Sequence, residues 1–151
     1  SLFLEKFKRI SEIIAFILCL MGGRAYSKTK LVKLLYLLDV IYARNNKSNL
    51  SGIEYKSYYY GPYSEDIDES LQFLEDEGYI SISRQIGIEG NVYYCVKLRN
   101  VPEFGQLDGR EKAKIQKLLS PLVNRSLDEL LDITYATKEY RQTKFNEVIS
   151  L

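Results

Sequence analysis

The segment from Leu2 to Met21 is apolar on most of its sides and contains the longest uninterrupted apolar run of the chain, the nine residues from Ile13 to Met21. Its apolar side chains at positions 4, 7, 10, 14, 17 and 18 lie near helical spacing, which predicts a helix. A helix that is apolar nearly all round must be covered by other parts of the protein or by a partner. Because a bilayer span needs about twenty apolar residues, the run predicts a core helix and no membrane segment.

Four further helices are predicted by residues that favour a helix start. The second helix ends at Asn45 and Asn46, the third ends before Gly78, and the fourth stops near Pro121, because these residue types interrupt helical backbone. The expected starting residues are the N-caps Ser27 and Ser64 and the capping boxes Asp108 with Glu111 and Ser126 with Glu129.

Two strands are predicted after the third helix, over residues 79–86 and 91–98, and the glycines at 87 and 90 favour a hairpin between them. No internal repeat or low-complexity tract divides the chain, so we expect a single domain over residues 1–151. The predicted fold class is α+β and mostly α-helical, a winged-helix-like domain with one β-hairpin.

In a DNA-binding winged helix, the helix before the wing lies in the major groove. The corresponding helix here, Ser64 to Glu77, carries seven carboxylates and neither lysine nor arginine. A phosphate backbone would repel such a helix. The element order therefore predicts a winged-helix shape, whereas the carboxylates argue against binding of this helix in the major groove of DNA.

The formal net charge of +1 conceals an uneven distribution. Residues 1–50 carry nine basic and three acidic side chains, a net charge of +6, whereas residues 51–80 carry one basic and eight acidic side chains, a net charge of −7. The two blocks could neutralise each other within the fold, or an acidic face could meet a basic partner. In a third alternative, Arg24, Lys28, Lys30 and Lys33 contact nucleic acid independently of the acidic helix.

The sequence contains no histidine, the commonest general base and metal ligand. It also contains no phosphate-binding glycine loop or calcium loop, and Asp66 with Glu69 is interpreted as a solvated helix face. We therefore expect no enzymatic activity, no catalytic or metal-binding residue and no cofactor. Cys19 and Cys95 lie among apolar neighbours and are predicted to be small buried core residues.

Five tyrosines stand between Ile53 and Tyr63, which favours extended backbone up to a break at Gly61-Pro62. If the stretch is one strand, Tyr58 and Tyr60 share a face and could line the core. Tyr59 would then point the other way and be available to a partner. Tyrosine is enriched in interfaces because it offers a large contact area at a low rotamer cost.

The chain contains KLVKLLYL at residues 30–37, YGPY at residues 60–63 and LLDITY at residues 130–135. Together these three segments resemble the Panacea domain, the SocA-like antitoxin family that is also described as phage-associated. Lys30 to Leu37 reads KLVKLLYL and resembles the Lys-Leu-x-Lys-Leu-Leu-Tyr helix of the family. Tyr60 to Tyr63 reads YGPY and resembles its aromatic Tyr-Gly-Pro segment, which precedes an acidic helix. Leu130 to Tyr135 falls at its Leu-x-x-Leu-Thr-His stretch, with tyrosine where histidine is usual. The resemblance covers about residues 26–140, after the apolar N-terminal helix.

The resemblance implies a helical domain with a small β element that acts as an antitoxin or adaptor by binding a toxin or another protein, within a toxin-antitoxin system and without catalysis. We expect a cytoplasmic protein with a protein partner, and leave open whether it forms homo-oligomers. A DNA-binding winged-helix regulator is the alternative. The candidate partner-binding or motif residues are Lys30, Lys33, Tyr36, Tyr59, Tyr60, Gly61, Pro62 and Tyr63.

Overall fold

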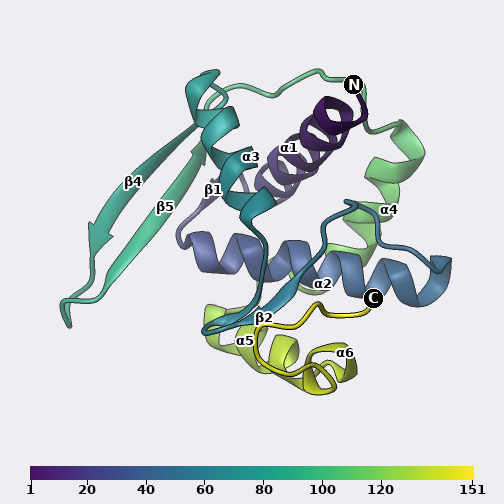
Figure 1. The fold of residues 1–151 in the computed structure, drawn as a ribbon. Helices are drawn as coiled ribbons and strands as arrows, with labels where there is room; N and C mark the ends of the chain where they lie inside the picture. The colour runs from purple at the N-terminus through teal and green to yellow at the C-terminus, as the bar shows by residue number, and fades with distance from the viewer.

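The computed structural model describes residues 1–151 and contains six helices and five short strands (Figure 1). The helices are α1 (Leu2–Leu20), α2 (Lys28–Asn46), α3 (Glu65–Asp76), α4 (Gly109–Leu119), α5 (Leu127–Ala136) and α6 (Lys138–Arg141). The strands are β1 (Arg24–Ala25), β2 (Lys56–Tyr58), β3 (Gly61–Tyr63), β4 (Ile80–Ile86) and β5 (Val92–Leu98). The predicted α+β class with a mainly helical content is confirmed.

The five predicted helices, α1 to α5, begin where the sequence predicts, whereas the short helix α6 was not predicted. Ser27 Oγ accepts a hydrogen bond from Lys30 N at 3.4 Å, and Ser64 Oγ accepts one from Asp66 N at 3.2 Å. Both predicted capping boxes are formed, at the starts of α4 and α5. These side chains satisfy backbone donors that have no partner within the helix.

The core is built around α2, which packs against α1, α4, α5 and strands β1, β3 and β5. In Figure 1, α2 crosses the middle of the molecule, with α1 above it and α5 and α6 below. Every residue from Leu31 to Val40 is buried. Helix α1 is mostly buried from Ile10 to Leu18, whereas Leu2 and Phe3 at its start are 85% and 72% exposed. No helix of the molecule is both long enough and apolar enough to cross a membrane.

The wing is the antiparallel hairpin of β4 and β5, which pairs Ile80 with Leu98 at one end and Ile86 with Val92 at the other. Strand β1 adds to β5 through only two residues, Arg24 and Ala25, to give the sheet order β1-β5-β4. The predicted hairpin is therefore confirmed. Helices α1, α2 and α3, strand β1 and the wing follow one another in the order of a winged helix.

A second hairpin, β2–β3, was not predicted. It forms because the chain reverses at Tyr59 and Tyr60, between the paired residues Tyr58 and Gly61, and not at Gly61-Pro62. Tyr58 and Tyr60 are consequently 46% and 84% exposed, and the prediction that they could line the core is wrong. Tyr55, at the start of the stretch, is the tyrosine that is fully buried.

The β2–β3 hairpin is held in place by segments distant in sequence. The Asp39 carboxylate of α2 is fully buried and accepts hydrogen bonds from Leu50 N, Ser51 N and Ser51 Oγ, and one from the Tyr55 hydroxyl at 2.7 Å. On the outer side of β2, residues 146–149 run alongside the strand. Asn146 N donates to Ser57 O, Ser57 N donates to Glu147 O, and Ile149 N donates to Tyr55 O at 2.8 Å.

The expectation for the cysteines is wrong. Cys19 is exposed, and Cys95 on β5 is only half-buried. The cause is that α1 presents one side of its last turns to solvent, and that β5 projects with the wing beyond the body of the protein (Figure 1).

Candidate binding site at the β2–β3 hairpin

The three sequence segments singled out above meet at one backbone carbonyl. Lys33 of α2 donates a hydrogen bond from Nζ to Tyr60 O at 2.8 Å. The Tyr135 hydroxyl of α5 donates to the same oxygen at 3.3 Å. The two helices therefore fix the turn of the hairpin through a shared acceptor.

Gly61 follows this carbonyl and leaves no room for a side chain. Its φ is +105°, in the region that favours glycine. A Cβ atom at this position would lie 2.8 Å from Lys33 Nζ and 3.1 Å from Tyr135 Cε1. The glycine thus permits both the backbone conformation and the close approach of the two side chains, while Pro62 beside it is buried.

Lys33 is an unusual lysine because its side chain is only 3% exposed and none of the five ion pairs of the protein includes it. Its ammonium has three donors, and the carbonyl of Tyr60 is its one hydrogen-bond partner. Burial lowers the pKa of Lys33 to about 8, because desolvation disfavours the charged form. Burial also raises the pKa of Tyr135.

Lys33 lines a pocket of about 380 Å³ between the β2–β3 hairpin and the wing. Five of the twelve lining residues are tyrosines. The lining consists of Lys28, Thr29, Val32 and Lys33 of α2, Tyr58, Tyr60, Gly61, Pro62 and Tyr63 of the hairpin, and Val92, Tyr93 and Tyr94 of β5.

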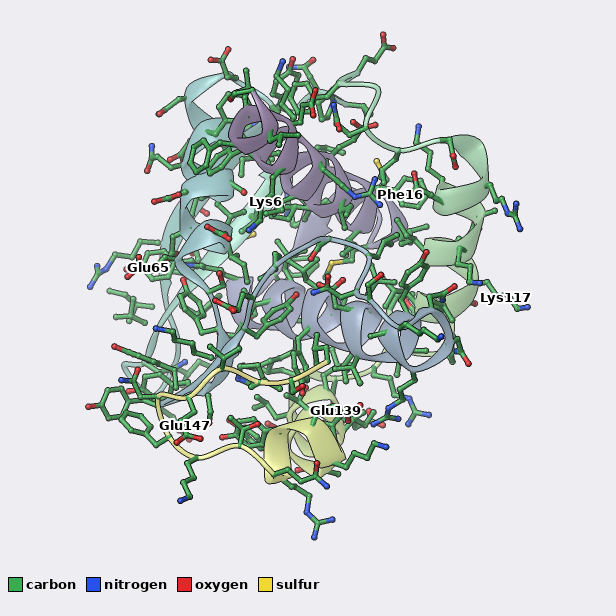
Figure 2. The ribbon with its side chains drawn as sticks, turned by 45° about the vertical axis from the view of Figure 1, so that its right-hand side comes forward. Lys6, Phe16, Glu65, Lys117, Glu139 and Glu147 are labelled. Atoms are coloured by element: carbon green, nitrogen blue, oxygen red, sulfur yellow. The ribbon has the colours of Figure 1, made fainter.

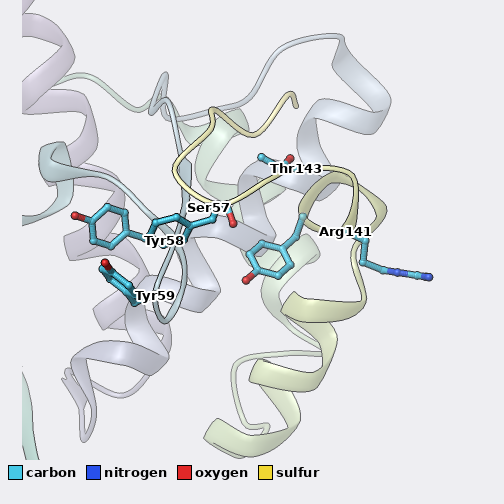
Figure 3. A pocket seen from close by; sticks show the side chains of 7 residues that line it. Ser57, Tyr58, Tyr59, Arg141 and Thr143 are labelled. Atoms are coloured by element: carbon cyan, nitrogen blue, oxygen red, sulfur yellow. The ribbon is translucent and has the colours of Figure 1, made fainter.

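A second hollow of about 610 Å³ lies on the other side of the hairpin, toward the C-terminal residues (Figure 3). Phe145 packs against Tyr59 with ring centroids 4.8 Å apart, and Tyr58 packs against Tyr59 at 5.2 Å. Figure 3 shows Tyr58 and Tyr59 side by side at the edge of the hollow, with Arg141 pointing away from them. Tyr58 lines both hollows.

The hairpin is thus surrounded by aromatic side chains that reach solvent, which we call the aromatic surface. Its members are at least 37% exposed: Tyr58, Tyr59, Tyr60, Tyr93, Tyr94, Tyr135 and Phe145. They come from β2, the turn, β5, α5 and the C-terminal segment. A gathering of this kind from five segments is unusual for a surface without a binding role.

The predicted site residues occupy different environments. Lys33, Tyr60, Gly61 and Pro62 line the pocket together with the half-buried Tyr63, and Tyr59 is 74% exposed. Lys30 is half-buried and does not line the pocket.

Tyr36 is fully buried, and its hydroxyl lies 2.9 Å from Thr137 Oγ1. A role for Tyr36 in contacting a partner is therefore corrected to one inside the core. There it packs edge-to-face on Tyr55, with ring centroids 5.3 Å apart.

The acidic helix α3 is partly neutralised by the basic N-terminal third of the chain. Asp66 pairs with Lys6 at 3.4 Å, and Asp68 pairs with Lys28 at 2.8 Å. Glu65 at the start of α3 pairs with no cation and lies at the outer edge of the molecule (Figure 2).

The four candidate nucleic-acid contacts do not form one free basic patch. Lys33 is buried, Lys28 is paired with Asp68, and Arg24 lies 5.5 Å from the Tyr26 ring centroid. Two of the four cations are therefore not free to neutralise phosphates.

Sequence reasoning missed three parts of this site. Asp39 was a lone acid within an apolar helix, and its position in that pattern was the signal that could have indicated a buried anchor. Tyr93 and Phe145 gave no signal, because only the folded chain brings the wing and the C-terminal segment to the hairpin.

Comparison with known proteins adds one match. A family model described as "Antitoxin SocA-like, Panacea domain" matches residues 31–140. This range includes Lys33, the β2–β3 hairpin and Tyr135. No curated protein and no solved structure matches the chain.

Proposed function

The chain belongs to the Panacea domain family of SocA-like antitoxins, and from this premise we propose that it binds and neutralises a toxin protein through the aromatic surface. The observation that carries the proposal is the exposure of seven aromatic side chains around one hairpin. Clustered exposed aromatics mark protein-interaction sites, and tyrosine is among the residues that contribute most to binding energy.

The hairpin is suited to binding because it is held rigidly before a partner arrives. Lys33 and Tyr135 fix its turn, Asp39 fixes the segment that leads into it, and residues 146–149 cover its outer strand. A surface that is already ordered loses less conformational entropy when it binds.

We propose binding rather than catalysis as the activity. Around the Tyr60 carbonyl the titratable side chains are Lys33 and Tyr135, and the chain has no histidine to act as a general base. The groups that meet there hold the hairpin in shape.

The experiment is co-expression with the protein encoded by the adjacent gene, followed by a growth assay and purification of the complex. Tyr59→Ala combined with Tyr60→Ala should abolish both rescue of growth and complex formation. Phe3→Ala is the matched control, because Phe3 is 72% exposed, close to the 74% of Tyr59, but lies at the start of α1. Well-folded protein that neither relieves toxicity nor forms a complex would contradict the proposal, as would equal losses in the two variants.

A DNA-binding regulator remains the alternative because the sheet order β1-β5-β4 is that of a winged helix. It predicts affinity that falls steeply with salt, with a slope reduced when the two cations that are free, Arg24 and Lys30, are neutralised. Electrophoretic shift assays at physiological salt test it, and only weak nonspecific binding would reject it.

A further inference from the structure

We propose that the pocket between the β2–β3 hairpin and the wing binds the carboxylate of an aspartate or glutamate side chain, presented by an extended segment of the protein partner, with Lys33 as its ion-pair partner. This inference rests on the proposed function and adds the chemistry that the surface recognises.

The first argument is the missing counter-ion. Lysines are almost never fully buried unless they are paired, yet Lys33 is 3% exposed and takes part in none of the ion pairs. One carbonyl occupies one of its three donors. Lys33 lines the pocket, and its Nζ lies 2.8 Å from the carbonyl of Tyr60, another lining residue. An anion entering the pocket would supply the partner that the protein itself does not.

The second argument concerns the charge of the occupant. Lys28, the other cation in the lining, is already paired with Asp68 at 2.8 Å. One unpaired positive charge matches the single negative charge of a carboxylate. A phosphate carries nearly two negative charges at neutral pH, and one of them would remain uncompensated in a half-enclosed pocket.

The third argument concerns the shape of the occupant. Strand β1 covers β5 only at Val96 and Lys97, so residues 92–95 of β5 have no strand on that side. Val92, Tyr93 and Tyr94 belong to this uncovered stretch and also line the pocket. An extended segment can add to a free strand edge by backbone hydrogen bonds and place one side chain into an adjoining pocket.

The walls of the pocket favour such an ion pair. The same pocket is lined by Tyr58, Tyr60 and Tyr63 from the hairpin and by Tyr93 and Tyr94 from the wing. Exclusion of water by these rings would strengthen the attraction between the two charges. The first turn of α2, at Lys28 and Thr29, also borders the pocket, and the positive end of a helix dipole favours an anion there.

The first test needs no toxin. The pKa of Lys33 is followed by NMR through its ¹³Cε signal while the wild-type protein is titrated with a blocked Val-Glu-Val tripeptide, its Val-Gln-Val counterpart or inorganic phosphate. The glutamate peptide should raise the pKa of Lys33 and shift the amides of residues 92–95, whereas the glutamine peptide should do neither. Equal responses to the two peptides, no response at tens of millimolar, or a larger response to phosphate would overturn the inference.

The second test uses the complex with the co-expressed partner. Lys33→Met should weaken binding about 30-fold or more, since truncating one member of a buried charge pair has effects of this size. The control is Lys117→Met. Lys117 is an exposed lysine on α4, on the opposite side of the molecule from α3 (Figure 2), and its replacement should leave the affinity unchanged.

The two tests separate the two proposals. A complex that depends on Tyr59 and Tyr60 but not on Lys33 would overturn the carboxylate pocket and leave the proposed function standing. A positive peptide titration without any toxin complex would overturn the proposed function and leave the carboxylate-binding pocket standing.

Discussion

Replacing Lys33 by methionine should make the protein more stable at neutral pH. Each pKa unit corresponds to about 1.4 kcal/mol, so the lowering of the Lys33 pKa from 10.5 to about 8 means that burying the protonated side chain costs about 3 kcal/mol. Methionine has a similar length and no charge, but it loses the hydrogen bond to Tyr60 O, which is worth about 1–2 kcal/mol. The expected net gain in the free energy of unfolding at pH 7 is about 1–2 kcal/mol.

The gain should depend on pH in a direction set by the lowered pKa. Below pH 8 the folded and unfolded states both hold the proton, and the wild type bears the full cost of burial. Between about 8 and 10.5 the unfolded state holds the proton and the folded state does not, so the stability of the wild type rises with pH. The advantage of Lys33→Met should therefore shrink across this window.

The assay is urea unfolding followed by circular dichroism at several pH values from 6 to 10, with Lys117→Met as the control for a lost surface charge. The other titratable groups near Lys33 are Lys28, Tyr58, Tyr60, Tyr63 and Tyr135, together with the tyrosines of β5. They are present in both proteins, so their titration largely cancels in the difference. A difference that stays constant from pH 6 to 10, or a variant that is less stable by more than about 2 kcal/mol at pH 7, would refute the reasoning.

Three further predictions concern the supports of the hairpin. Gly61→Ala should destabilise the protein by about 1–3 kcal/mol, because φ is +105° and the new Cβ would meet Lys33 and the Tyr135 ring; unchanged urea unfolding would contradict this. Asp39→Ala should destabilise the protein by about 3 kcal/mol or more, because the amides of residues 50 and 51 and the hydroxyls of Ser51 and Tyr55 lose their buried acceptor. Slow amide hydrogen exchange at residues 50 and 51 should become fast in this variant. Retained protection of these amides would contradict the structural role given to Asp39. Arg44→Met removes the hydrogen bonds of Arg44 that hold the pKa of Glu139 below 4.5. The stability lost by this variant should therefore be largest above pH 4.5 and should vanish as the pH falls through the lowered pKa. A loss of stability that is the same at pH 3 and pH 6 would exclude this origin.

Helix starts could be predicted from the sequence because they depend on side chains only two or three residues away. Ser27, Ser64 and the two capping boxes act locally, and the wing is a hairpin with glycines at its own turn. The resemblance to the Panacea family rests on segments that are likewise short and continuous, and the family match confirms it.

The turn at Tyr59 and Tyr60 could not be predicted in the same way. Neither residue has a strong turn preference, and the reversal is held by Lys33 and Tyr135, which lie 27 and 75 positions away from Tyr60 in the chain. The exposure of Tyr58 and Tyr60 follows from that reversal. The aromatic surface therefore depends on contacts that only the folded chain provides.

The strip of backbone at residues 146–149, which lies along β2, also sets an order of events during protein synthesis. Residues 56–63 leave the ribosome long before their outer neighbour has been translated, and until then β2 has an open edge on which another chain could pair. A chain that stops at residue 145 keeps that edge open. A chain that stops at residue 144 also lacks Phe145, which packs against Tyr59. Truncated products should therefore aggregate or be degraded instead of persisting beside the protein that contains residues 146–149.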